Sequence, residues 1–164
     1  MDNSPIEEKL DEATALFSRR AESVETGLDV NGPDTLQLRK ACRLLEAARR
    51  LNEENGFYTL VIEASFAATE RTLQFYLIEN NILSPGEYVD HREVYERGED
   101  AGLYQDGFKE KLIALWRDNR SESYYREGVG SEARAEAMLE FAERLHGHVL
   151  QLAGRSYDCI CSSD

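Results

Sequence analysis

Lysine, proline and long apolar runs are scarce in this sequence of 164 residues. Only 4 of its 19 basic residues are lysines, and its 3 prolines leave long stretches open to helix formation. No apolar run approaches the roughly 20 residues that a membrane-spanning helix needs, and no charged-then-apolar leader precedes a cleavage site. We therefore expect a soluble, cytoplasmic protein that does not associate with a membrane.

Cysteine is also rare, and Cys42, Cys159 and Cys161 cannot all pair within one chain. A chain of this length buries a hydrophobic core without disulfides or a bound metal. The pair Cys159 and Cys161 could hold a soft metal or form a redox couple, but the sequence offers nothing nearby to complete a tetrahedral site. A loose tail is the simpler interpretation.

The three histidines form no recognisable metal motif. Glu143 and His146 have the Glu-x-x-His spacing of di-iron bundles, but such sites need two of these pairs and two further glutamates. We expect His146 and His148 at the surface or rim of the last helix, and His91 in a structural hydrogen bond. The sequence thus predicts no metal site and no cofactor.

Acidic residues dominate the charge, with 32 acidic against 19 basic residues and a net charge of -13. An acidic surface on which arginine replaces lysine is typical of a halophile, because molar salt screens the self-repulsion. In ordinary cytosol this charge argues against binding nucleic acid, since phosphate affinity depends on basic residues. In a salt-adapted cell nearly every protein is acidic, so a local arginine cluster is more informative than the total.

Helix signals run along the whole chain, and no segment alternates as a strand does. Apolar residues recur at three- and four-residue spacing between capping serines or aspartates and terminating glycines or asparagines. Small residues fill the middle of the most apolar segment, which we expect to be central. The predicted helices cover about residues 4–24, 34–55, 57–80, 84–103, 106–127 and 131–153.

Long helices joined by short loops favour an all-α, antiparallel up-and-down bundle of about five to six helices. We expect residues 1–154 to form this single domain. Residues 155–164 are expected to form a loose C-terminal tail, because a glycine ends the last helix.

An unusual run of arginines and tyrosines ends the fifth predicted helix. Arg117, Arg120 and Tyr124 fall at i, i+3 and i+7 and so share a helix face, and Tyr125 and Arg126 follow directly. Guanidinium groups bind phosphate oxygens bidentately, and a phenol can stack on a base, so this face is a candidate RNA- or phosphate-binding site. Pairing of the arginines with the protein's own carboxylates is the competing interpretation.

This run resembles the motif of the HEPN family, helical bundles of toxin–antitoxin and nucleotidyltransferase-associated systems. Arg117 and Asp118 match the arginine and polar residue that open the motif, and Tyr124 matches its tyrosine. Glu122 occupies the position of the family's histidine. The order of an alanine-rich central helix, a short helix, the motif helix, a glycine turn and a closing helix also fits, so the resemblance covers about residues 34–152.

The resemblance implies a homodimer, because active family members are metal-independent RNases whose arginine and histidine meet in a cleft shared by two protomers. It also implies a possible nucleotidyltransferase partner, which in some systems adenylylates the motif tyrosine, here Tyr124. Glu122 is a poor replacement for the histidine, since a carboxylate is ionised at neutral pH and repels phosphate. We therefore expect weak or absent nuclease activity.

Three functions remain open at this point. The first is a non-catalytic or degenerate HEPN-like protein that binds RNA or a partner protein. The second is a working RNase in which Arg117, Arg120 and Tyr124 suffice, or in which Glu122 replaces the histidine. The third is a structural or regulatory interaction protein with no nucleic-acid role, which predicts that the arginine face is bonded internally.

Overall fold

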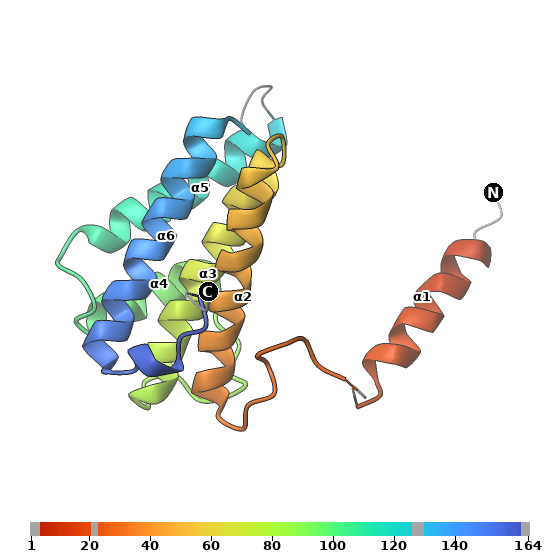
Figure 1. Cartoon of the computed structure of the whole chain (residues 1–164), viewed down its shortest axis with the longest axis horizontal. Coiled ribbons are helices and arrows are strands. Elements are labelled where there is room, and N and C mark those ends of the chain that lie inside the picture. The colour runs from red at the N-terminus through yellow and green to blue at the C-terminus, as the bar shows by residue number, and fades with distance from the viewer. Residues whose placement is uncertain (1–3, 21–22, 126–129, 162–164) are drawn as a thin grey trace.

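The computed structural model describes residues 4–20, 23–125 and 130–161, which form helices and no strands (Figure 1). The all-α class is thereby confirmed. Each described helix is too short or too polar to cross a membrane. The elements are α1 (Ser4–Phe17), α2 (Pro33–Glu53), α3 (Tyr58–Glu79), α4 (His91–Asp100), α5 (Phe108–Tyr125), α6 (Glu132–Ala153) and the short 3-10 helix η1 (Ser156–Asp158).

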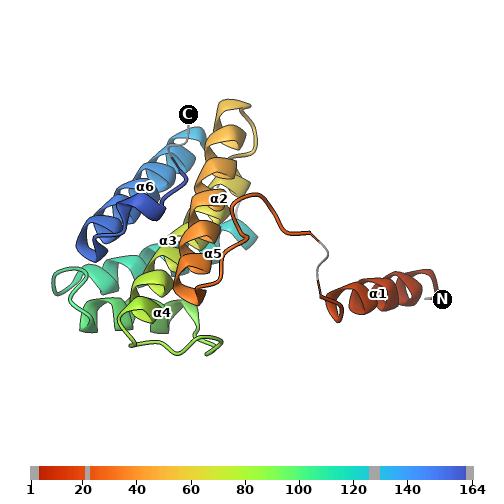
Figure 2. The ribbon, with the colours of Figure 1, turned by 60° about the horizontal axis from the view of Figure 1, so that its bottom comes forward.

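Helix α3 lies at the centre of the bundle, as its small residues and apolar character predicted. It packs along α2 on one side and α6 on the other, and it also contacts α4, which pairs with α5 (Figures 1 and 2). Leu73 and Phe75 of α3 are fully buried against Leu38 of α2, and Val61 is fully buried near Leu45. Each such side chain contributes about 1.5–3 kcal/mol when it leaves water.

Local signals fix several helix ends. Ser131 accepts a hydrogen bond from the backbone N–H of Arg134, which caps the start of α6. Gly154, with φ of 66°, ends α6 in the left-handed conformation. Asn55 and Gly56, with φ of 54° and 92°, follow the end of α2 in the same way.

Helix α4 begins later than the sequence predicted. The segment that starts at Ser84 forms a turn, in which the N–H of Glu87 bonds the Ser84 carbonyl and the Glu87 carboxylate accepts the Ser84 N–H. The helix starts instead after Asp90, whose side chain accepts a hydrogen bond from the Glu93 N–H. The local bonds of a capping box are therefore made here without a helix behind them.

Helix α1 stands apart from the bundle, which corrects the expectation of one bundle over residues 1–154 (Figures 1 and 2). Every side chain from Pro5 to Phe17 is exposed, and Phe17 is 93% exposed. The helix also ends at Phe17, short of the predicted end at residue 24. The apolar stripe of α1 predicted its helical form correctly, but the stripe covers no part of the core.

The C-terminal segment, expected to be a loose tail, packs on the bundle as far as it is described. Arg155 bonds Asp34 of α2 at 3.2 Å, Glu79 of α3 at 2.8 Å and Asp158 of η1 at 2.5 Å. These carboxylates raise the pKa of the Arg155 guanidinium, and the largest cause is the hydrogen bond that Arg155 donates to Asp158. The chain thus returns to α2 after α6 ends (Figure 1).

Candidate functional site

The arginine–tyrosine segment forms the C-terminal half of α5. Arg117, Asp118 and Arg120 have described side chains. Glu122, Tyr124 and Tyr125 belong to the last turns of α5, but their side chains lie outside the described residues, as does Arg126 altogether. The geometry of the predicted motif can therefore be followed from Arg117 to Arg120.

Arg117 and Arg120 differ in their surroundings. The Arg120 guanidinium lies 3.2 Å from a carboxylate oxygen of Glu63 in α3 and 5.6 Å from the ring centre of Trp116. The neighbouring Asn119 donates a 3.2 Å hydrogen bond to the other oxygen of Glu63. Arg117 is 67% exposed, and its ion pair with Asp118 is 3.5 Å long. Arg120 therefore helps to join α5 to α3, whereas Arg117 faces solvent.

Trp116 also contacts α4. The His91 ring stacks on Trp116 at 4.7 Å, and His91 Nδ1 lies 2.5 Å from the Glu70 carboxylate. Tyr95 also donates a 3.0 Å hydrogen bond to Glu70. Burial, and then the Glu70 charge, raise the pKa of the Tyr95 hydroxyl, which keeps its proton. His91 thus has the structural hydrogen bond that was predicted for it.

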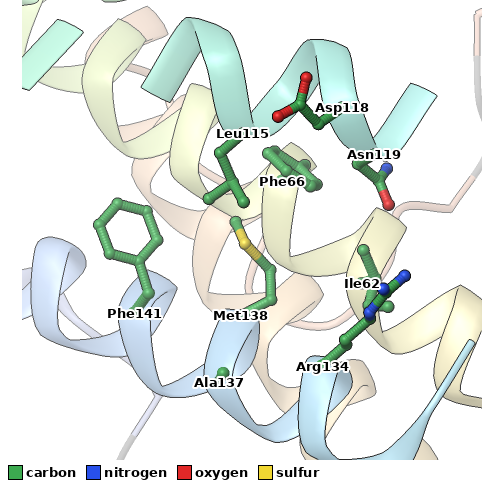
Figure 3. Close-up of a pocket in the computed structure, with 9 residues that line it drawn as sticks. All are labelled: Ile62, Phe66, Leu115, Asp118, Asn119, Arg134, Ala137, Met138 and Phe141. Carbon is green, nitrogen blue, oxygen red and sulfur yellow. The ribbon is translucent and has the colours of Figure 1, made fainter. Parts of the chain in front are cut away.

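An apolar pocket of about 340 Å³ opens beside the arginine–tyrosine segment, between α3, α5 and α6 (Figure 3). Leu115, Phe66 and Met138 point into it from these three helices. The polar lining residues are Asp118, Asn119 and Arg134. Its walls are suited to an apolar side chain and not to a phosphate group. The pocket is lined by Ile62, Phe66, Leu115, Asp118, Asn119, Arg134, Ala137, Met138 and Phe141.

Four potential metal ligands meet at a second place, where the tail returns to the bundle. Cys42 of α2 and His146 of α6 lie beside Cys159 and Cys161, and their ligand atoms are all within 4.8 Å of one another. His146 is 4% exposed, which corrects its expected surface position. His148 is exposed, as expected, with Nε2 3.1 Å from the Leu103 carbonyl oxygen.

The thiols of this cluster influence one another's ionisation. Hydrogen bonds from Cys161 and Cys42 lower the pKa of the Cys159 thiol. The hydrogen bond to Cys159 raises the pKa of Cys161 and that of Cys42, the latter to about 11. From the sequence alone, only Cys159 and Cys161 were predicted to lie together. Their two partners are distant in the chain, and the one available signal was that Cys42 and His146 each follow the apolar stripe of a helix.

The protein is thus an all-α bundle with a separate N-terminal amphipathic helix, and it carries two candidate sites, the apolar pocket and the cysteine–histidine cluster. The chain belongs to the family described as "Domain of unknown function (DUF8154)", whose model matches residues 1–161. The matched range includes α1, the bundle and all three cysteines. No curated protein and no solved structure matches the chain.

Proposed function

We propose that this protein is a non-catalytic, HEPN-like binding module that associates with a second copy of itself. The observation that carries the proposal is the open apolar pocket beside Arg117. The same chain also exposes the apolar stripe of the amphipathic helix α1. One chain therefore has both an unfilled pocket and an uncovered apolar stripe. Burying the two against each other removes apolar surface from water, which is the main driving force of association.

A binding role agrees better with the α5 face than catalysis does. Arg120 is engaged by Glu63 and Trp116, so it is not available to stabilise charge on a phosphate. Glu122 adds a carboxylate where the family's RNases have a histidine. The overall charge of -13 disfavours an approaching polyanion. A toxin–antitoxin or nucleotidyltransferase-associated system is the setting that the HEPN resemblance proposes for such a module.

Helix α1 of the second copy is the proposed occupant of the pocket. Ile6, Leu10 and Phe17 lie on one helix face and are all exposed. The linker behind α1 is fastened to α2, since Glu25 accepts a 2.7 Å hydrogen bond from Arg43. If two chains exchange their α1 helices, the apolar stripe of each α1 covers the pocket between α3, α5 and α6 of the other chain.

Mass measurement by light scattering, at low and at molar salt, tests this proposal. We expect a dimer whose population rises with concentration. Phe17→Glu on α1 and Leu115→Glu in the pocket should each shift it to monomer, since either places a charge in the interface. Tyr88→Glu and Leu152→Glu alter comparably exposed side chains elsewhere and should leave the dimer intact.

Two outcomes of the mass measurement would count against exchange of α1. A monomer at every concentration would show that the chain does not self-associate. A dimer that survives both Phe17→Glu and Leu115→Glu would mean that the chains meet through another face.

RNA binding is the second candidate, and the exposure of Arg117 is the observation that favours it. A gel-shift titration with structured RNA compares the wild-type chain with Arg117→Ala. Binding through Arg117 predicts weaker binding by the variant and a shallower salt dependence. Equal binding by both proteins, or none by either, removes this candidate. Cleavage of the RNA by the wild-type chain alone would instead restore the RNase hypothesis.

A further inference from the structure

One histidine nitrogen faces three sulfur atoms where the tail meets the bundle. His146 Nε2 lies 3.4 Å from Cys161 Sγ, 3.5 Å from Cys159 Sγ and 3.7 Å from Cys42 Sγ. A ring nitrogen has either one N–H to donate or one lone pair to accept with, so it cannot hydrogen-bond all three sulfurs. A shared ion between the four atoms accounts for their arrangement directly.

We propose that this cluster is a closed, tetrahedral site for one structural zinc ion, with three thiolates and one imidazole as ligands: Cys42, Cys159, Cys161 and His146. The site lies at the junction of α2, α6 and the tail, away from the pocket of the proposed function, and it does not depend on that function.

The distances between the ligand atoms match those that zinc imposes. With Zn–S bonds of about 2.3 Å and Zn–N bonds of about 2.05 Å, a regular tetrahedron has S–S edges of about 3.8 Å and S–N edges of about 3.6 Å. The Sγ atoms of Cys42 and Cys159 are 3.8 Å apart, and the three S–N distances are 3.4–3.7 Å. These four distances lie within a few tenths of an ångström of the tetrahedral edges, and the two remaining distances, from Cys161 Sγ to the other two sulfurs, are no longer than 4.8 Å.

A disulfide does not explain the same atoms. Two bonded sulfurs lie about 2.05 Å apart, far closer than the 3.8 Å between Cys42 and Cys159. All three cysteines are free, and an odd number leaves one thiol over in any pairing. Thiolate and imidazole together are the donor set that zinc prefers, and four protein ligands leave no open position for a substrate. The site is therefore structural.

The surroundings orient the ligands. Thr72 Oγ1 lies 2.8 Å from His146 Nδ1, which fixes the ring and leaves Nε2 for the metal. The N–H of Cys161 donates a 3.4 Å hydrogen bond to Cys159 Sγ. Arg49 donates a 2.7 Å hydrogen bond to the Cys161 carbonyl. Zinc with three thiolates carries a net charge of -1, and the guanidinium of Arg49, which also pairs with Glu143, is the cation beside it.

Zinc at this site would act as a clasp for the whole C-terminal segment. Cys42 and His146 come from two helices of the core, whereas Cys159 and Cys161 come from the tail, so one ion joins three parts of the chain. The tail in turn meets the linker of α1. Gly27 of this linker lies against the Ile160 side chain of the tail. A Cβ added at Gly27 would be only 2.5 Å from Ile160 Cδ1. The clasp thus also fixes where the α1 linker leaves the bundle.

Metal analysis of the full chain, purified without a histidine tag, tests the site. We expect one equivalent of zinc per chain. Replacement of zinc by Co²⁺ should give the intense visible bands of a tetrahedral ion together with thiolate-to-cobalt charge-transfer bands, saturating at one equivalent. Cys159→Ser and Cys161→Ser lie in the part-exposed tail and leave the core intact, and each should weaken Co²⁺ binding by more than about 100-fold. His148→Gln, on the same helix as His146, should bind as the wild-type chain does.

Three results would overturn the proposal. The first is a wild-type chain that binds neither zinc nor cobalt. The second is a cobalt complex with the pale spectrum of an octahedral ion and no charge-transfer band, which would mean binding to surface carboxylates. The third is unchanged Co²⁺ affinity in both Cys159→Ser and Cys161→Ser.

Discussion

Removing the Thr72 hydroxyl, which lies beside the histidine ligand, tests whether the cysteine–histidine cluster binds a metal ion or is only a group of buried side chains. Thr72→Val keeps the shape and the β-branch of a side chain that is 1% exposed, and it removes only the oxygen 2.8 Å from His146 Nδ1. Without that partner the ring is held less firmly and donates less strongly to the metal. We expect zinc affinity to fall about 10- to 100-fold, or about 1.4–2.7 kcal/mol of binding free energy, with the stoichiometry unchanged.

Thr69→Val is the matched control for this change. Thr69 lies one turn earlier on the same helix and is fully buried, but its hydroxyl donates a 2.9 Å hydrogen bond to the Ser65 carbonyl within α3 and not to His146. Both variants lose a buried hydrogen bond, so each should lower the free energy of unfolding by about 1 kcal/mol. Only Thr72→Val should alter metal affinity.

Competition against a chromophoric zinc chelator measures these affinities on the folded proteins, with circular dichroism as the check on folding. If Thr72→Val and Thr69→Val both hold zinc as tightly as the wild-type chain, Thr72 does not support a metal ligand. That role of Thr72 is equally refuted if both weaken zinc binding to the same extent, since that would reflect general loosening of α3.

Two further predictions concern the stability of the fold. At a free zinc concentration about 1,000 times the dissociation constant, the ion adds about 4 kcal/mol to the free energy of unfolding. A chelator should therefore lower the Tm of the wild-type chain by roughly 10 °C. An unchanged Tm, or an equal fall of Tm in Cys161→Ser, would contradict this prediction. Gly154→Ala should lower the free energy of unfolding, measured by chemical denaturation, by about 1–2 kcal/mol, because the backbone φ at this position is 66°. The space around the new Cβ is open, so the cost comes from the backbone alone. An unchanged free energy of unfolding would mean that α6 ends differently in solution.

Helix positions were predictable from the sequence because the interactions that set them are local. Ser131 bonds a residue three positions away, and Gly154 needs only its own freedom to adopt positive φ. The same locality explains the error at α4: Ser84 and Glu87 form the short-range bonds of a cap whether or not a helix follows. Which of two candidate caps starts the helix depends on packing, and Asp90 starts it where Val94 and Tyr95 are buried.

The arginine–tyrosine segment shows the limit of a helix-face argument. Spacing alone placed Arg117 and Arg120 on one face of the predicted helix, whereas in the structure Arg117 faces solvent and Arg120 bonds Glu63 of α3. Their different surroundings follow from Glu63 and Trp116, and Glu63 belongs to another helix, so periodicity within α5 carries no information about it. The same holds for the pocket, whose walls come from three helices.

The all-helical class, the positions of most helices and the acidic composition follow from the amino-acid sequence, because capping and periodicity act between residues a few positions apart and charge can be counted. Two features depend on packing between distant segments: α1 stands outside the bundle, and Cys42 and His146, 104 residues apart, meet the two cysteines of the tail. The packing of α2 and α6 on α3, and the anchoring of the tail by Arg155, bring those ligands together. A metal site needs ligand atoms within about 4 Å of one another, and that distance is a property of the packed helices.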